Sequence, residues 1–144
     1  MMMPTYLNGE LILPGQWVKV WVQAMGGIWH QGIVWRILRV GDGFYIEIVH
    51  NVKNRGVIVS SLEDFSEGGR VFLERRPSSP EHARLILATA NENLGKAYSA
   101  FSQNCEHFCW FCYTWEPKSE TVQAFVGLAA VGLLALLAFK SDSN

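Results

Sequence analysis

The sequence predicts an α+β domain, in which an antiparallel sheet is followed by helices, and a membrane-spanning helix near the C-terminus. Three observations lead to this prediction. Strand-like segments fill the first half of the chain, helical spacing of apolar residues begins after Arg76, and an uninterrupted apolar segment lies close to the C-terminal end. With 144 residues, the chain has the length of one domain with a substantial core.

The strands are expected from alternation and from turn residues. The segment "WVKVWVQ" (17–23) alternates apolar and polar side chains. "QGIVWRILRV" (31–40) and "FYIEIVH" (44–50) flank Gly41-Asp42-Gly43, which is a strong hairpin signal. Further short strands are expected at 56–60 and 70–76, with turn-like sequence between them.

Two helices are expected in the second half of the domain. In the first, Ser79 is a suitable N-cap, Pro80 takes the first helical position and Gly95 ends the helix. In the second, Asn104 is the expected N-cap and Pro117 ends the helix. The order of strands and then helices is typical of an α+β domain.

A membrane anchor is expected at 122–139, where "VQAFVGLAAVGLLALLAF" contains Gln123 as its single polar side chain. As a helix this segment would span about 27 Å, which suits a thin bilayer such as that of the endoplasmic reticulum. A buried core helix is the alternative, but such a helix normally keeps a polar face. The position of the segment predicts a tail anchor, with the preceding domain facing the cytosol.

Composition excludes other classes of protein. The net charge is −1 and the basic residues are scattered, so no nucleic-acid-binding face is expected. Three cysteines, without a signal-peptide pattern at the start, argue against a disulfide framework and for a reducing compartment. Cys109 and Cys112 are expected to be packing residues rather than metal ligands, because no second ligand pair at metal spacing occurs elsewhere. Neither a metal nor a cofactor is expected.

Cys105 is the first candidate for chemistry, because it follows Asn104 in the first helical turn. Free backbone N–H groups and the positive end of the helix dipole favour thiolate over thiol there, and the same amides could donate to an oxyanion. The Glu106 carboxylate works against this effect, since a nearby negative charge raises a thiol pKa.

A nucleophilic cysteine also needs a base, and the chain has four histidines. We expect His82 to be a surface residue, and His107 lies about 200° around the helix from Cys105, too far to reach the sulfur. This leaves His30 and His50, both on strands of the predicted hairpin. A cysteine at a helix start with a histidine on a sheet is the papain-like arrangement, although a structural cysteine stays open as an alternative.

The segments "WHQGIVW", "VGDGFYIEIVH", "SLEDFSEGG" and "LGKAYSAFSQNCEHF" resemble the lecithin:retinol acyltransferase-like family, which includes small vertebrate phospholipase A/acyltransferases. The resemblance covers about residues 15–123. It implies a permuted papain-like fold and a cysteine that takes an acyl chain from a glycerophospholipid and passes it to water, an amine or an alcohol. By this resemblance Cys105 is the nucleophile and His30 is its general base.

The third catalytic residue is where this sequence departs from the family pattern. In the family a second histidine follows the Gly-Asp-Gly turn closely and orients the first; here Glu47 occupies the expected position and His50 lies three residues later. If Gly41–Gly43 is a three-residue loop, Val40 faces Phe44.

The same register places His50 opposite Val34, on the face of His30, and turns Glu47 to the other face. The prediction therefore selects His50, with Glu47 as the alternative. Since His30 would then face Asn54, the two histidines would be about 13 Å apart along the strand, and a bulge or bend near Gly32 would have to close the gap.

The expected organisation is an N-terminal extension at 1–14, a catalytic domain at 15–121, the membrane anchor at 122–139 and a short tail at 140–144. The expected function is that of a membrane-anchored thiol acyltransferase or phospholipase A acting in lipid metabolism. The alternative is a catalytically weak or inactive member of the same family that acts as a membrane-associated interaction protein.

Overall fold

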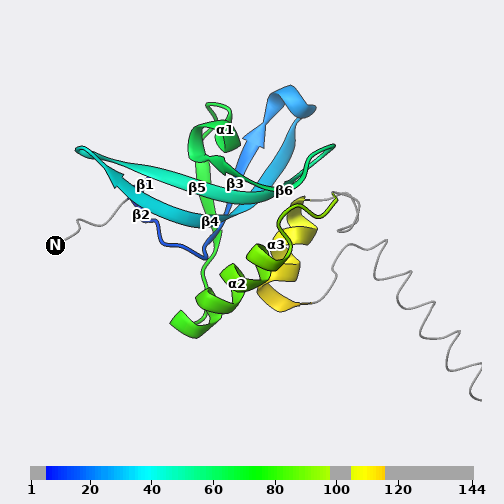
Figure 1. Ribbon diagram of the computed structural model, residues 1–144. Helices are drawn as coiled ribbons and strands as arrows, with labels where there is room; N and C mark the ends of the chain where they lie inside the picture. Colours follow the sequence, from blue (N-terminus) through cyan, green and yellow to red (C-terminus); the bar gives the residue numbers. More distant parts are fainter. Residues whose placement is uncertain (1–5, 98–104, 116–144) are drawn as a thin grey trace, which may run out of the picture.

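The computed structural model describes residues 6–97 and 105–115. Its centre is a five-stranded antiparallel sheet with strand order β6-β5-β4-β3-β7, and a separate two-stranded hairpin precedes it (Figure 1). The strands are β1 (Tyr6–Leu7), β2 (Glu10–Leu11), β3 (Trp17–Val22), β4 (Ile28–Val40), β5 (Gly43–Val52), β6 (Gly56–Ser61) and β7 (Val71–Arg75). The prediction of an α+β domain with an antiparallel sheet is thereby confirmed.

Within the described residues, three α-helices accompany the sheet: α1 (Leu62–Ser66), α2 (Pro80–Glu92) and α3 (Cys105–Thr114). A short 3-10 turn, η1 (Gln23–Met25), joins two of the strands. The start of α2 is as predicted, because the Ser79 hydroxyl accepts a hydrogen bond from the backbone N–H of His82 and Pro80 follows it. Helix α1 was not predicted. It forms because the Ser61 hydroxyl accepts from the Asp64 N–H and so caps a single helical turn.

Helix α1 lies on one side of the sheet, and α2 and α3 lie on the other (Figure 1). The core has two parts, one on each face of the sheet. On one face, α2 and α3 pack over residues from β3, β4, β5 and β6; the buried members of this cluster are Trp17, Ile33, Val49, Val57, Ile86, Ala90, Phe108, Cys109, Cys112 and Tyr113. On the other face, Phe65 of α1 packs with aliphatic side chains of the strands; the remaining buried members are Ile12, Val18, Val20, Val22, Val34, Ile46, Ile48 and Val71. Alternation along each strand therefore sorts side chains between two different environments.

His82 is not the surface residue that we expected. It is half-buried between α2 and α3, where its Nε2 lies 3.0 Å from the Tyr113 carbonyl oxygen and its Nδ1 accepts from the Ser78 N–H. The prediction was wrong because α3 packs across the first turn of α2, a tertiary contact that the helical pattern of α2 alone does not contain.

The register of the β4–β5 hairpin differs from the predicted one. Val40 pairs with Gly43 rather than with Phe44, so the turn has two residues, Gly41 and Asp42. Gly41 has φ +58°, the left-handed conformation that short hairpin turns require and that glycine adopts readily.

A β-bulge interrupts the same hairpin farther down. Arg36 pairs with Glu47, but Val34 pairs with Ile48, so Trp35 is an extra residue on β4. The predicted pairing of Val34 with His50 is therefore wrong, because both the shorter turn and the bulge shift β5 relative to β4.

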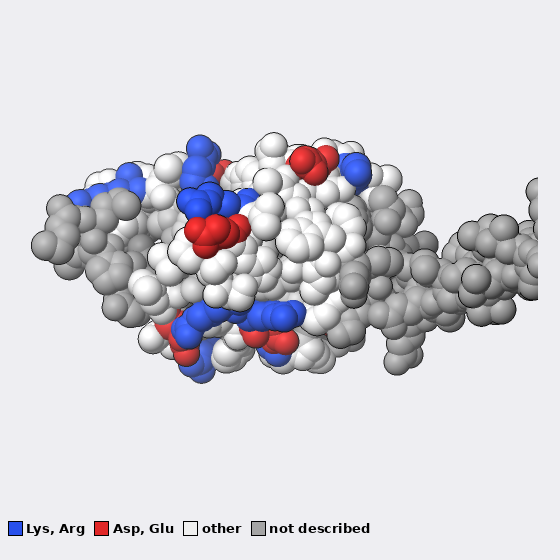
Figure 2. Space-filling view, turned by 90° about the horizontal axis from the view of Figure 1, so that it is seen from below, with Lys and Arg blue, Asp and Glu red and all other residues white. Residues whose placement is uncertain are grey.

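Among residues 6–97 and 105–115, no helix is long and apolar enough to cross a membrane. The predicted anchor at 122–139, the tail at 140–144 and the predicted N-cap Asn104 all lie outside the described residues. Charges of both signs lie close together on the described surface seen in Figure 2, so that face carries no extended field of one sign.

Candidate active site

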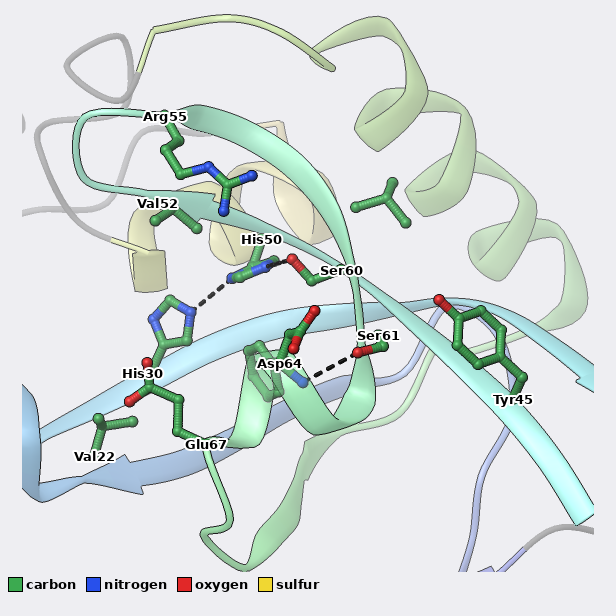
Figure 3. A pocket seen from close by; sticks show the side chains of 12 residues that line it. Val22, His30, Tyr45, His50, Val52, Arg55, Ser60, Ser61, Asp64 and Glu67 are labelled. Carbon is green, nitrogen blue, oxygen red and sulfur yellow. Dashed lines mark hydrogen bonds between the residues drawn. The ribbon is translucent and has the colours of Figure 1, made fainter.

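His30 on β4 and His50 on β5 form a buried, hydrogen-bonded pair (Figure 3). The His30 Nε2 lies 2.7 Å from the His50 Nδ1, and the rings meet edge to face. Phe65 of α1 packs against both imidazoles, with its ring centroid 5.0 Å from that of His30 and 5.2 Å from that of His50. The structure thus brings together the two histidines that the sequence singles out.

The bulge at Trp35 makes this meeting possible. Without the extra residue, the register near the turn would continue and place His50 opposite Ile33, on the sheet face away from His30. With it, Ile33 pairs with Val49, so His50 and His30 point to the same face. The sequence led us to expect a bulge or bend near Gly32 that would bring the two histidines together. The bulge is present, but it lies at Trp35.

Ser60 of β6 extends the pair into a line of three polar side chains. Its Oγ lies 2.8 Å from the His50 Nε2, on the far side of that ring from His30 (Figure 3). Ser60 was not predicted from the sequence. The signal that could have found it is register, because Ile48 pairs with Ser60 and therefore shares a sheet face with it and with His50.

Burial keeps both imidazoles neutral. It lowers the pKa of His30 from 6.5 to about 4. For His50, burial first, and then the positive charges of His30 and Arg55, lower the pKa to about 3. At neutral pH the pair therefore holds two uncharged rings, each able to donate through one nitrogen and accept through the other.

Glu47, the alternative third residue, lies away from the histidine pair. It is on the opposite face of β5 from His50, and its carboxylate accepts a hydrogen bond from the Arg36 Nε at 2.6 Å. Its partner across the hairpin is thus a guanidinium rather than an imidazole.

Cys105 is the first residue of α3 and is buried, with 7% of its surface exposed. Its thiol lies 3.7 Å from the Trp29 carbonyl oxygen, to which it can donate. Burial raises the pKa of the thiol, and the Glu106 carboxylate adds to this, while the N–H groups of Gln31 and Glu106 lower it. Because burial is the largest effect, the expectation that the helix start favours thiolate is overturned, and the resting residue is a thiol.

The Cys105 thiol lies against the backbone of strand β4 beside His30. Trp29 and Gln31, whose backbones contact the sulfur, are the neighbours of His30 in the chain. However, α3 packs on the face that holds Ile33, whereas the His30 ring lies against Phe65. In the described part of the chain, no hydrogen bond joins the thiol to the imidazole.

The other two cysteines are free and lie fully buried in the cluster beneath α2 and α3. Within the described ranges, no group of histidine, cysteine and carboxylate side chains is arranged to hold a metal ion.

A pocket of about 370 Å³ opens beside the histidine pair (Figure 3). His30, His50 and Ser60 line it together with apolar side chains from the strands and from α1, and Arg55, Asp64 and Glu67 bring charge to it. The histidine line is therefore accessible from solvent on this side of the sheet.

The family model for lecithin retinol acyltransferase matches residues 38–118, more than half of the chain. The matched segment contains His50, Ser60 and Cys105, and it begins after His30. Searches of curated proteins and of solved structures give no match. The chain belongs to the lecithin retinol acyltransferase family.

Proposed function

We propose that this protein is a membrane-associated thiol acyltransferase or phospholipase A that carries the acyl group as a thioester on Cys105. Membership of the family supports acyl-transfer chemistry in general. The observation that carries the finer proposal is the buried line His30–His50–Ser60, with Cys105 held against the backbone on either side of His30.

The hydrogen-bond line defines which nitrogen would act as the base. His30 uses Nε2 to contact His50, so Nδ1 is the nitrogen left to accept the thiol proton. His30 then donates through Nε2–H to His50 Nδ1, and His50 donates through Nε2–H to Ser60 Oγ. This set of tautomers uses both contacts and holds His30 ready as a base.

In the first step, the Cys105 sulfur attacks the ester carbonyl of a glycerophospholipid as its proton passes to His30. Collapse of the tetrahedral intermediate breaks the ester bond, and the departing lysophospholipid oxygen takes the proton back from His30. In the second step, water, an amine or an alcohol loses a proton to His30 and attacks the thioester carbonyl; the C–S bond then breaks, the acyl group stays on the acceptor, and the Cys105 sulfur takes the proton back from His30. The backbone N–H groups around the sulfur, those of Gln31 and Glu106, are suited to stabilise the oxyanion.

The membrane part of the proposal comes from the sequence. An anchor at 122–139 would hold a cytosolic domain close to its water-insoluble substrate and raise the effective concentration of that substrate. The length of the apolar segment favours the endoplasmic reticulum.

Intact mass measurement tests the nucleophile. The full chain in mild detergent is incubated with short-chain phosphatidylcholine, and free fatty acid is measured in the same tube. We expect an added acyl mass that hydroxylamine removes and that peptide mapping assigns to Cys105. Cys105→Ser should lose both adduct and fatty acid release, and Cys112→Ser is the control that should keep both.

The state of the Cys105 thiol favours a second function, that of a non-catalytic interaction protein. The thiol is buried, its pKa is raised and it makes no hydrogen bond to His30 within the described residues. If folded wild-type protein gives neither adduct nor fatty acid, this second function replaces the first.

A further inference from the structure

Three large aromatic rings lie exposed beside one another at one end of the sheet. They belong to Trp21 at the end of β3, Trp29 at the start of β4 and Phe72 at the start of β7, and they are 45%, 41% and 38% exposed. The ring centroids of Trp21 and Trp29 are 5.4 Å apart, and those of Trp29 and Phe72 are 6.1 Å apart. A contiguous exposed apolar surface of this kind typically marks an interaction site.

The rings lie on the sheet face that α3 covers farther along. Trp17 packs against Trp110 and Tyr113 of α3, and Trp21 is four residues later on the same strand, so both side chains point to the same face. Trp29 pairs with Trp21 across the sheet, and its carbonyl oxygen contacts the Cys105 thiol. The exposed rings therefore border the start of α3 and the candidate nucleophile.

Two cations sit over these rings. The Lys19 Nζ is 4.6 Å from the centre of the Trp29 ring, and the Arg70 guanidinium is 5.1 Å from that of Phe72. Lys19 also pairs with Glu74 at 2.7 Å, whereas Arg70 forms no ion pair with a described residue. We call these five residues, Lys19, Trp21, Trp29, Arg70 and Phe72, the aromatic patch.

We infer that the aromatic patch seats the domain on an anionic phospholipid surface and delivers the acyl ester toward Cys105, an inference that rests on the proposed function. Tryptophan rings prefer the level of the lipid headgroups. Lysine and arginine beside them are attracted to anionic headgroups. The aromatic patch thus combines tryptophan rings that suit the headgroup level with cations that attract anionic headgroups. One of its residues, Trp29, contacts the Cys105 thiol through its carbonyl oxygen.

A second copy of the chain fits the same surface less well. Two patches placed face to face would bring the Lys19 and Arg70 cations of one copy toward those of the other, which costs free energy. An anionic bilayer instead supplies the opposite charge.

Fluorescence quenching by brominated lipids tests membrane contact without needing turnover. The full chain is reconstituted into phosphatidylcholine vesicles that carry bromine near the headgroup, with and without phosphatidylglycerol. We expect the quenched part of the tryptophan emission to be smaller in Trp21→Phe than in the wild type, because the substitution removes a tryptophan that would lie close to the bromine atoms. Trp35→Phe is the control, since Trp35 is half-buried in the hairpin, and it should leave the quenched part unchanged.

Charge is tested separately with Arg70→Glu. Each cation at an anionic surface is worth about a fivefold change in association. We therefore expect this variant to lose the extra quenching that phosphatidylglycerol causes and to keep the quenching in neutral vesicles. A matched substitution on the opposite part of the domain, Arg84→Glu on α2, should change neither.

The outcomes separate this inference from the proposed function. Equal quenching of wild type and Trp21→Phe in both kinds of vesicle overturns the patch as a membrane surface, even if Cys105 forms its adduct with short-chain lipid. Quenching that depends on Trp21, without any adduct, supports the patch and removes the catalytic function. A dimer in detergent that Trp21→Ser dissociates, without quenching in vesicles, would show a second copy as the occupant and overturn the inference.

Discussion

At the scale of single residues, the histidine pair is unusual because two titratable rings share a hydrogen bond inside the fold. His30 and His50 are 7% and 5% exposed, and both pKa values lie far below 6.5. A charged ring here would lose hydration, and two charged rings would repel one another, so the fold favours the neutral forms. Neutrality leaves one ring nitrogen of His30 able to accept a proton at physiological pH.

Acid should therefore destabilise the domain. The unfolded chain binds protons at both rings below about pH 6.5, whereas the folded chain resists protonation down to about 4 at His30 and about 3 at His50. Stability is then complete above pH 6.5 and is lost as the pH falls toward 4, by about 1.4 kcal/mol per pH unit for each ring at full slope. Thermal unfolding of the full chain in mild detergent between pH 7 and pH 4 measures this.

The matched variant for this measurement is His50→Gln, which removes one of the two titrating rings. Its melting temperature should fall less steeply with acid than that of the wild type. An identical pH dependence in both proteins would show that other groups cause the acid effect.

The third residue of the site can be identified by comparing two alanine substitutions. We expect His50→Ala to lower the rate of acyl transfer by about tenfold to hundredfold, because it removes the hydrogen bond that orients His30. Glu47→Ala should stay close to wild type in rate, since it breaks only the contact with Arg36. Steady-state kinetics with short-chain phosphatidylcholine give the comparison, and equal losses in both variants would mean that neither residue orients the base specifically.

Ser60 belongs to the same test as a positioning residue. Replacing it by alanine leaves His50 Nε2–H without its acceptor and should reduce kcat by a smaller factor than His50→Ala. Rescue by Ser60→Thr, which restores a hydroxyl, would distinguish orientation of the ring from a general effect on the fold.

At the scale of elements, the β4–β5 hairpin shows what sequence could and could not predict. Both strands, the turn around Gly41 and the candidate histidines follow from alternation and turn residues. The number of residues in the turn and the position of the bulge do not, because each depends on which packing the whole sheet accepts. Helix α1 was missed for a related reason: one capped turn is stable only because Phe65 packs against the sheet.

The position of Phe65 depends in turn on Gly32. A methyl group at Gly32 would lie 2.5 Å from the Ile48 Cγ2, 3.0 Å from the Phe65 Cε2 and 3.1 Å from the Val49 carbonyl oxygen. We expect Gly32→Ala to lower the free energy of unfolding by about 1–3 kcal/mol through overpacking. The variant should also disturb the two imidazoles that Phe65 supports.

Gly43→Ala is the matched control on the same hairpin, because the nearest atom to its added methyl group is the Val40 carbonyl oxygen at 3.9 Å. Thermal unfolding compares the two variants. A Gly32→Ala protein as stable as Gly43→Ala would show that the strands can separate locally at no cost, contrary to the packing described.

At the scale of the whole molecule, the sequence predicts a domain held on a membrane, and the described fold adds a second surface that suits a bilayer. The apolar segment 122–139 would anchor the chain, and the aromatic patch would orient the domain. These two features have different effects. An anchor limits the distance between the domain and the bilayer but lets the domain rotate, whereas a surface that contacts the lipid fixes which side of the domain faces the bilayer.

The anchor itself has a direct test. Carbonate extraction of cell membranes should leave the full chain in the pellet. Carbonate removes peripheral proteins, whereas a protein with a membrane-spanning helix stays in the bilayer. Deleting residues 122–144 should move the protein to the supernatant. Full-length protein in the supernatant would mean that this segment is not a membrane span.

The bulge at Trp35 has a further consequence for how the hairpin can vary in length. Beyond the bulge, residues pair one to one from Arg36–Glu47 to Val40–Gly43, and this outer part is mostly exposed. Removing or adding one residue in each arm there keeps every remaining pair and leaves both histidines in place. Adding or removing a residue in one arm alone would move the side chains in the inner half of that strand to the opposite face of the sheet. The outer hairpin can therefore lengthen or shorten by cross-strand pairs, while the segment between Trp35 and the histidines tolerates no single insertion.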